Sequence, residues 1–219
     1  MNTIAITGTN TDIGKTFVTC ALAREIKNRG INVGVFKPFC SGSRDDAEKL
    51  IDAAKVTDTI EDVNPFYFSQ PLAPYHALKL SNEKIDLKKC FDAYDVLRQN
   101  HDLLLVEGAG GILVPINKSP NGKIYSFIDL FADMACDIII VASRELGTIN
   151  HSWLTAKACK EAGLNVKGFI FNDATPVEEK EPALSNPEII SECSSVQTLG
   201  IVKYNDKLTQ WQQIVDKIL

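Results

Sequence analysis

The stretch that decides the fold is GTNTDIGKT, residues 8–16, which directly follows the apolar run Thr3–Thr7. It opens Gly14–Arg29, where apolar residues recur at helical spacing until Arg29-Gly30 provides a stop signal. A strand, a glycine-bounded loop that ends in Gly-Lys-Thr and a helix are together the context of a phosphate-binding loop. Five residues separate the two glycines, whereas the strict motif has four, so the loop is a modified form.

The loop residues have the chemistry that phosphate binding requires. Backbone N–H groups of the loop and the N-terminus of the helix attract negative charge. Lys15 would bridge the terminal phosphates of a nucleotide, and the Thr16 hydroxyl would ligate Mg²⁺. The alternative is a plain glycine-rich turn with a surface lysine. Strand, loop, Gly-Lys-Thr and helix all favour the nucleotide site.

Composition excludes several classes of protein. The chain has 219 residues, 45% hydrophobic and 23% charged, which is typical of one globular domain spanning 1–219. Its 23 basic and 28 acidic residues give 23 − 28 = −5, which argues against general nucleic-acid binding. The apolar runs are far shorter than the ~20 residues of a membrane span, and the N-terminus lacks signal-peptide features. Six scattered cysteines indicate reduced thiols, which predicts a cytoplasmic protein. From the charge and the short apolar runs we expect no nucleic-acid partner and no membrane partner.

Short β-branched runs alternate with longer helical patterns along the chain. This alternation predicts an α/β fold, a single domain with a mostly parallel sheet flanked by helices. The expected strands are Thr3–Thr7, Val33–Lys37, Leu103–Glu107, Ile138–Ser143, Val166–Asn172 and Leu199–Val202. The expected helices are Gly14–Arg29, Asp45–Ala54, Asn82–Gln99, Ser126–Met134, Ile149–Ala162, Asn186–Ser194 and Asp206–Ile218. Proline-rich composition predicts irregular excursions over Asn64–His76 and Asp173–Glu188.

Charged residues follow two other strands of the expected sheet. Lys37 ends one strand, and Glu107 ends a very apolar run before the glycine-rich Gly108–Gly111. Carboxyl ends of parallel strands line the ligand crevice, so both side chains should point toward the phosphate loop. A carboxylate there suits Mg²⁺, which prefers oxygen ligands. We expect Lys15 and Lys37 to be exposed, so that replacing either should barely affect folding.

Several motifs together resemble the dethiobiotin synthetases, which have a P-loop NTPase-like fold. The resemblance rests on the modified loop at 8–16, KPFCSG at 37–42, VEGAGG at 106–111, LGTINH at 146–151 and Asn172-Asp173. It implies an ATP- and magnesium-dependent ligase of biotin biosynthesis, with ATP as co-substrate. The family reaction converts diaminopelargonic acid and carbon dioxide into the cyclic urea dethiobiotin through phosphorylation of a carbamate. The resemblance also implies a homodimer with shared active sites.

The same resemblance implies a role for each motif residue. Lys37 and Lys15 are the expected catalytic groups, and Thr16, Asp46 and Glu107 are the expected magnesium ligands. Asp45 stays an alternative to Asp46, because the loop before them is shorter than in the family. The expected nucleotide-binding residues are Thr11, Asp12, Ile13, Gly14, Lys15, Thr16, Phe17, Asp46, Glu107, Gly108, Ala109, Gly110, Asn172 and Asp173. The expected substrate-binding residues are Thr11, Lys37, Ser41, Gly147, Thr148, Ile149 and Asn150, with the segment around Asn150 acting across the dimer interface.

The chain departs from the family pattern near its end. Leu199–Tyr204 replaces the usual proline-containing segment near the nucleotide base, and the remaining tail is short. We therefore expect a looser preference for ATP than is usual in the family. A partitioning- or metal-insertion-type P-loop ATPase switch is the main alternative function, although such switches carry a lysine where this loop has Thr9. The third hypothesis is a module that binds nucleotide without catalysing a reaction, and such a module would not need Lys37, Ser41 and Glu107 together.

Overall fold

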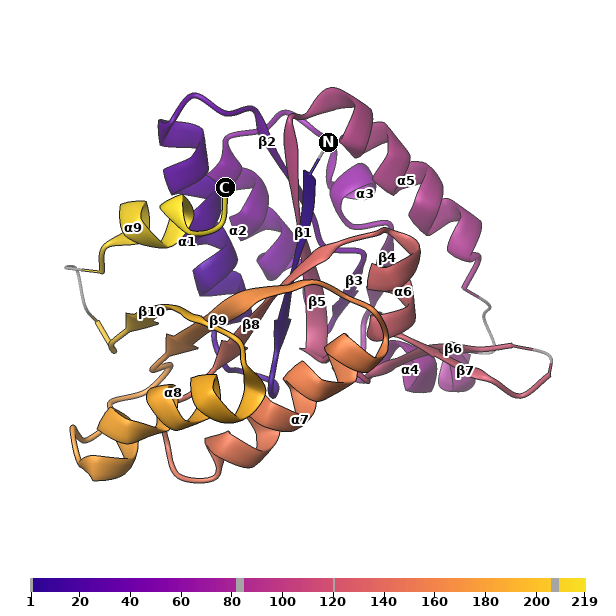
Figure 1. The fold of residues 1–219 in the computed structure, drawn as a ribbon. Coiled ribbons are helices and arrows are strands. Elements are labelled where there is room, and N and C mark those ends of the chain that lie inside the picture. Colours follow the sequence, from indigo (N-terminus) through magenta and orange to yellow (C-terminus); the bar gives the residue numbers. More distant parts are fainter. Residues whose placement is uncertain (1, 82–84, 120, 206–208) are drawn as a thin grey trace.

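Six parallel strands form the central sheet of the computed structural model, which describes residues 2–81, 85–119, 121–205 and 209–219 (Figure 1). The strand order across the sheet is β10-β9-β8-β1-β5-β2. The strands are β1 (Asn2–Gly8), β2 (Val33–Phe36), β5 (Leu103–Gly111), β8 (Asp137–Ala142), β9 (Val166–Asn172) and β10 (Thr198–Val202). Their near-continuous apolar runs suit a sheet that is buried on both faces. The predicted α/β fold is confirmed.

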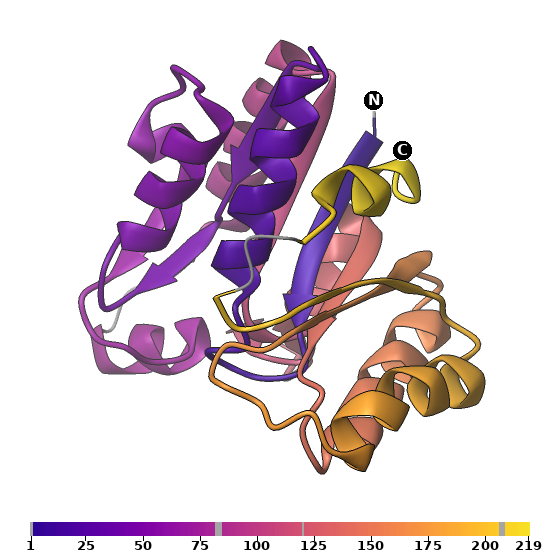
Figure 2. The ribbon, with the colours of Figure 1, turned by 90° about the vertical axis from the view of Figure 1, so that its left-hand side faces the viewer.

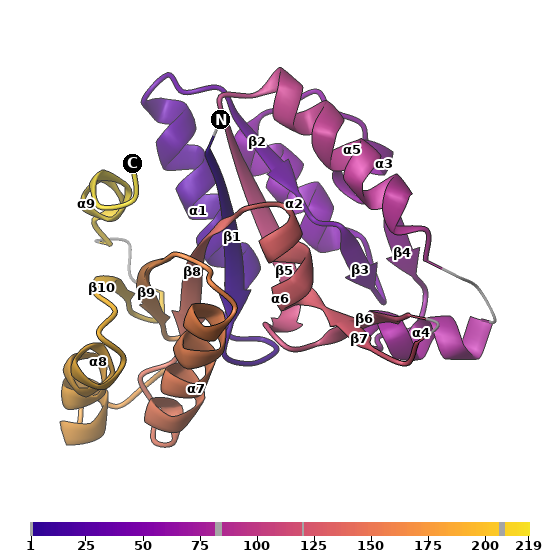
Figure 3. The same ribbon diagram turned by 45° about the vertical axis from the view of Figure 1, so that its right-hand side comes forward.

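Helices cover both faces of this sheet. One face carries α1 (Lys15–Asn28), α2 (Asp45–Ala54) and α9 (Trp211–Asp216), and the other carries α5 (Leu87–Asn100), α6 (Phe127–Asp133), α7 (Thr148–Glu161) and α8 (Glu181–Ser194). Because side chains alternate along a strand, Ile4 and Ile6 of β1 pack toward the first group and Ala5 packs toward the second. Figure 2 shows α1 and the orange helices on opposite sides of β1, and Figure 3 shows α6 and α7 in front of the sheet. In the described part of the chain, no helix combines the length and the apolar character of a membrane span.

Several short elements lie beside the sheet. Strand β3 (Phe39–Ser41) pairs in parallel with β4 (Phe66–Phe68), and β6 (Pro115–Lys118) forms an antiparallel hairpin with β7 (Ile124–Ser126). Two further helices are α3 (Ile60–Val63) and α4 (Pro74–Ser81). Elements this short carry too little periodicity to be predicted. The expectation of irregular chain over 64–76 is therefore wrong for β4 and for the first residues of α4.

Three helices begin five residues away from the start that the sequence predicts. Helix α8 begins at Glu181, inside the stretch 173–188 that was expected to be irregular, because Pro182 lies in the first turn, where proline is tolerated. Helix α5 begins at Leu87, and the Asp86 side chain caps it by accepting from the Lys88 N–H at 2.9 Å. The start expected for that helix at 82, and the start expected for the last helix at 206, lie outside the described residues. In the described part, the last helix begins at Trp211.

The sheet topology brings three motifs that are distant in sequence to one edge. Strand β5 lies between β1 and β2, so the carboxyl ends of these three strands are neighbours. The phosphate loop follows β1, Lys37 follows β2, and β5 carries Glu107. In an open parallel sheet this edge is where ligands bind.

Candidate active site

The phosphate loop connects β1 to α1 and depends on left-handed backbone conformations. Gly14, which caps α1, has φ 91°, and Asp12 has φ 56°. A Cβ atom on Gly14 would lie 2.2 Å from the side-chain nitrogen of Asn172, so a glycine is required there. The N-terminus of α1 thereby faces a cavity that Gly14 and Thr16 line.

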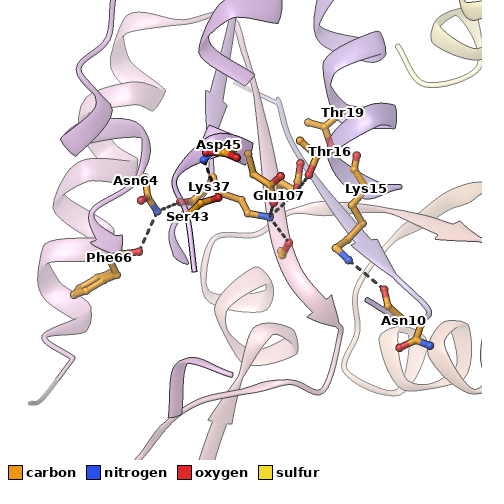
Figure 4. A network of polar contacts seen from close by, with 12 residues as sticks. Asn10, Lys15, Thr16, Thr19, Lys37, Ser43, Asp45, Asn64, Phe66 and Glu107 are labelled. Carbon is orange, nitrogen blue, oxygen red and sulfur yellow. Dashed lines mark hydrogen bonds and ion pairs between the residues drawn. The ribbon is translucent and has the colours of Figure 1, made fainter. Parts of the chain in front are cut away.

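Lys37 and Glu107 form a buried ion pair at the centre of Figure 4. Lys37 Nζ lies 2.5 Å from Glu107 Oε1 and donates to the Gly108 carbonyl at 3.1 Å. Asp46 Oδ2 lies 3.5 Å from the same nitrogen. The Thr16 hydroxyl donates to Glu107 Oε1 at 2.8 Å, which connects α1 to the pair. Residues of α1, α2 and β5 therefore meet around one lysine, which follows β2.

Lys15 is the first residue of α1, and its surroundings lower its pKa. Its Nζ donates to the Asn10 carbonyl at 3.2 Å. Burial, followed by the positive charge of Lys37, lowers the pKa of Lys15 to about 8. Burial also disfavours the charge on Lys37, but the carboxylates of Glu107 and Asp46 outweigh it and raise the pKa of Lys37. The nearby carboxylates therefore only partly neutralise the positive charge of Lys15, as suits a group that meets an anionic ligand.

Both lysines are buried, contrary to the expectation that they are exposed. Lys15 is 7% exposed, Lys37 is 3% exposed and Glu107 is 1% exposed. Segments that follow the strands, including β3 and α2, fold back over the strand ends, and no local sequence pattern indicates this. Removing one partner of a buried pair costs about 3–5 kcal/mol. The expectation that folding is barely affected therefore fails for Lys37.

Oxygen atoms suited to a divalent cation lie at the same place. Glu107 Oε2 is buried without a hydrogen-bond partner among the described residues, while Oε1 accepts hydrogen bonds from Lys37 and Thr16. Asp46 lines the cavity, whereas Asp45 is exposed and lies outside the lining. The described ranges contain no group of three or more His, Cys, Asp or Glu side chains that could hold a metal ion by themselves. Two carboxylates and a hydroxyl fit Mg²⁺, which keeps several waters and shares its ligands with phosphates.

A cavity of about 670 Å³ opens beside these charges. It brings together many of the predicted site residues: Thr11, Asp12, Gly14, Lys15, Thr16, Lys37, Ser41, Asp46, Glu107, Ala109 and Gly110. Its lining also includes apolar residues, among them Phe39, Leu72 and Val114. A cavity lined by both charged and apolar side chains suits a ligand that joins an anionic group to an aliphatic chain.

Other predicted residues lie outside this lining. Ile13 and Asn172 meet each other, because the Asn172 amide nitrogen donates to the Ile13 carbonyl at 2.9 Å. Phe17 is 55% exposed, and its ring lies edge-on to that of Trp211 with centroids 6.2 Å apart. Asn172 and Phe17 therefore lie next to the phosphate loop, on the side away from Lys37.

The predicted substrate segment lies at the start of α7. Gly147 has φ 94° and caps the helix, Thr148 is buried, Ile149 is half-buried and Asn150 is exposed. Its position at the carboxyl end of β8 places it at the same sheet edge as the phosphate loop. Within a single chain, this segment is not part of the cavity lining.

Arg144 was not among the predicted site residues. It lies two residues after the end of β8, is 1% exposed, and donates to both oxygens of the Asp173 carboxylate. The signal that could have found it is a charged residue at the end of a fully apolar strand. The same signal identified Lys37 and Glu107.

Known sequences similar to this chain are dethiobiotin synthetases. A family model described as an AAA domain matches residues 2–212. The chain is 36% identical over 215 residues to the ATP-dependent dethiobiotin synthetase BioD of Thermodesulfovibrio yellowstonii, covering 94% of this chain and 90% of that protein. It is 38% identical over 204 residues to BioD of Bacillus licheniformis, covering 90% and 83%.

Solved structures with a similar fold include MinD cell division proteins and a ParA family ATPase. The MinD cell division protein of Aquifex aeolicus matches with a TM-score of 0.60 and 18% identity, covering 99% of this chain and 94% of that one. A ParA family ATPase of Chlorobium tepidum matches with a TM-score of 0.58 and 11% identity, covering 99% and 90%. At such identities the likeness shows the fold alone, and it confirms the predicted P-loop NTPase-like architecture. The sequence relatives, in contrast, show that the chain belongs to the dethiobiotin synthetase family.

Proposed function

We propose that this chain is an ATP- and magnesium-dependent dethiobiotin synthetase of biotin biosynthesis. One amine of diaminopelargonic acid forms a carbamate with carbon dioxide, and the γ-phosphoryl group of ATP transfers to that carbamate. The second amine then closes the ring and expels phosphate, leaving dethiobiotin and ADP. The observation that carries the proposal is the group of Lys15, Lys37 and Glu107 in the lining of a cavity that apolar side chains also line.

The side chains present match the demands of this reaction. Phosphoryl transfer asks mainly for positioning and charge neutralisation. Lys15 and Lys37 would stabilise the negative carbamate and the transferring phosphoryl group. Thr11 and Ser41 offer hydroxyl groups in the same lining, and its apolar residues would contact the aliphatic chain of the substrate.

Thr16, Asp46 and Glu107 would hold Mg²⁺ together with the phosphates. The unpartnered Glu107 Oε2 supports this assignment, since a buried carboxylate oxygen needs a donor or a cation. When bound, the cation neutralises charge on the phosphates. Glu107 would then orient Lys37 through one oxygen and face the cation through the other.

A homodimer with shared sites is part of the proposal. Asn150 is exposed and lies outside the cavity lining of its own chain. Beside it, Leu146, Trp153 and Leu154 are 89%, 46% and 57% exposed. Exposed apolar groups clustered in this way are typical of protein interfaces. In a two-fold dimer, each chain would lend its Gly147–Asn150 segment to the carboxylate of the partner's substrate.

Mixed dimers test the shared site. A dimer of one Lys15→Ala chain and one Asn150→Ala chain carries both lesions in one site and neither in the other. Two different affinity tags would isolate this dimer, and we expect it to show about half of the wild-type activity. If subunit exchange is demonstrated and the mixed dimer shows no recovery of activity, the result would contradict a site shared between chains.

The nucleotide preference should be loose. The Asn172 amide nitrogen donates to the Ile13 carbonyl, and the Asp173 carboxylate accepts from Arg144. Asn172 is 3% exposed and Asp173 is 5% exposed, so little of either side chain is accessible to a base edge. Discrimination against a wrong base depends on buried polar groups that it leaves unpaired. We expect ATP to be preferred over other nucleoside triphosphates by less than ~10³-fold in kcat/KM. Competition assays measure this ratio, and a larger one would defeat the expectation.

The proposal places the enzyme in the cytoplasm, acting on small molecules without nucleic-acid or membrane partners. The net charge of −5 supports the absence of a nucleic-acid partner. All six cysteines are free thiols, which supports a reducing compartment.

Product analysis tests the activity itself. The protein would be incubated with diaminopelargonate, ¹³C-bicarbonate, Mg²⁺ and ATP, and the products examined by mass spectrometry. We expect dethiobiotin that carries the label in its ureido carbon. ATP hydrolysis without dethiobiotin would favour the alternative of an ATPase switch and would overturn the proposed function.

A further inference from the structure

Arg144 is the largest fully buried side chain among the described residues. Its guanidinium donates to both oxygens of Asp173, at 3.1 and 2.5 Å, and to both oxygens of Glu179, at 3.2 and 2.8 Å. It also donates to the Ala183 carbonyl at 3.3 Å. Two bidentate carboxylates fix a planar guanidinium in position and orientation, which a lysine could not reproduce.

Helix α8 is adapted to accept this side chain. Pro187 lies inside the helix and has no N–H to donate to the carbonyl four residues earlier, which is that of Ala183. The freed Ala183 carbonyl accepts from Arg144 instead. Next to the proline, the Asn186 side chain donates to the backbone carbonyls of Arg144 and Glu145, at 2.9 and 3.2 Å. Helix α8 therefore holds both the side chain and the backbone of Arg144.

The cluster connects two segments that serve different ligands in the proposed function. On one side, the chain continues from Arg144 into the Gly147–Asn150 turn, which the Thr148 hydroxyl fastens by donating to the Ser143 carbonyl at 2.8 Å. On the other side, Asp173 follows Asn172, whose side chain donates to the carbonyl of Ile13 in the phosphate loop. A continuous chain of contacts thus joins the start of α7 to the phosphate loop.

The charges of the cluster balance. Lys203 lies 3.2 Å from Glu179, so Arg144 and Lys203 face Asp173 and Glu179. Hydrogen bonds from Arg144 and Lys203 lower the pKa of Glu179 to about 2. Two members reach the surface: Glu179, whose side chain is 41% exposed and contacts Arg144 directly, and Lys203, whose side chain is 53% exposed and pairs with Glu179. The side chains of Arg144 and Asp173 are 2% exposed. Glu179 is therefore the point where the contacts of Arg144 can be altered without opening the core.

We propose that Arg144, clamped by Asp173 and Glu179, is a positioning residue that holds the substrate-carboxylate segment and the nucleotide-side segment in one arrangement. This inference rests on the proposed function. Arg144 lies outside the lining of the cavity, so weakening its contacts should impair binding of both ligands and leave the chemical step nearly unchanged. Energetic coupling of this kind between two sites typically changes affinity by about 5- to 150-fold.

Steady-state kinetics of Glu179→Gln test the clamp. The substitution removes one charge and replaces one acceptor oxygen by an NH₂ group that faces the guanidinium. We expect the KM for diaminopelargonate and the KM for ATP each to rise about fivefold, with kcat within about twofold of wild type. Glu179→Asp should restore both KM values in part, because the charge returns. Glu178→Gln is the matched control, since Glu178 pairs with exposed Lys180 outside the cluster, and it should change neither KM.

The outcomes separate this inference from the proposed function. If the wild type forms no dethiobiotin, the proposed function fails. If the wild type is active but Glu179→Gln changes only one of the two KM values, the clamp does not link the two segments. A lower melting temperature with both KM values unchanged would leave Arg144 a structural residue alone and would overturn the inference.

Discussion

Two clusters of charged side chains lie at the carboxyl edge of the sheet, and each has two positive and two negative members. Lys15, Lys37, Asp46 and Glu107 form the reaction cluster. The clamp cluster is made of Arg144, Lys203, Asp173 and Glu179. Each contains charged residues placed within, or one or two residues after, buried parallel strands: Lys37 and Glu107 in the first, and Arg144, Asp173 and Lys203 in the second. They differ in how completely their hydrogen-bonding capacity is used.

A buried oxygen of the reaction cluster has no hydrogen-bond partner in the described part of the chain, whereas the guanidinium of the clamp cluster has a carboxylate partner for every nitrogen. Lys15 has a pKa lowered to about 8 by burial and by Lys37, and Glu107 Oε2 has no hydrogen-bond partner among the described residues. In the clamp cluster, by contrast, all three nitrogens of the Arg144 guanidinium donate to carboxylates. Buried polar groups without partners are costly unless a ligand supplies them. The comparison therefore assigns ligand chemistry to the first cluster and positioning to the second.

The largest effect is expected from removing a lysine of the reaction cluster. Lys37→Ala and Lys15→Ala should each lower kcat by at least ~10²-fold, the usual cost of one preorganised charge-stabilising group. Because Lys37 is buried against Glu107, Lys37→Ala should also lower the free energy of unfolding by about 3 kcal/mol. Turnover at saturating substrate and urea unfolding measure the two effects.

A double variant separates stability from chemistry in that test. Lys37→Ala/Glu107→Gln also removes the stranded carboxylate charge, so it should recover part of the stability and none of the turnover. Near-wild-type turnover of either single lysine variant would remove that lysine from the mechanism and break the contrast between the clusters.

A smaller effect is expected from altering the oxygen that has no partner. Glu107→Gln should raise the Mg²⁺ concentration for half-maximal activity about tenfold, because a neutral amide is a poor magnesium ligand. Nucleotide binding should weaken less, since the phosphate loop is unchanged. Magnesium titrations of activity check this, with Glu179→Gln as the control that should keep the wild-type requirement. An unchanged requirement in Glu107→Gln would exclude Glu107 as a metal ligand.

The smallest effect distinguishes two neighbouring carboxylates. Asp46 lies 3.5 Å from Lys37 and lines the cavity, but its side chain is 45% exposed, so solvent weakens its interactions. Asp46→Asn should raise the magnesium requirement about threefold, and Asp45→Asn should leave it unchanged. The reverse pattern would mean that Asp45 is the ligand.

The sequence predicted the parts of this molecule that local patterns encode. Apolar runs located all six strands of the central sheet, and the charged residues that follow them located Lys37 and Glu107. Local patterns did not encode tertiary closure, so the burial of Lys15 and Lys37 and the short β3–β4 and β6–β7 pairs were not foreseen. The three prolines of the expected loop 173–188 concealed α8. The third, Pro187, has a tertiary role there, because it frees a carbonyl for Arg144.

Turnover of Lys37→Ala and Glu179→Gln, measured side by side at saturating diaminopelargonate, bicarbonate, ATP and Mg²⁺, tests the division between the two clusters most directly. Saturation removes effects on binding, so kcat reports the chemical machinery alone. The account predicts a kcat at least ~10²-fold below wild type for Lys37→Ala and within about twofold of wild type for Glu179→Gln. Equal losses of kcat in the two variants would contradict it.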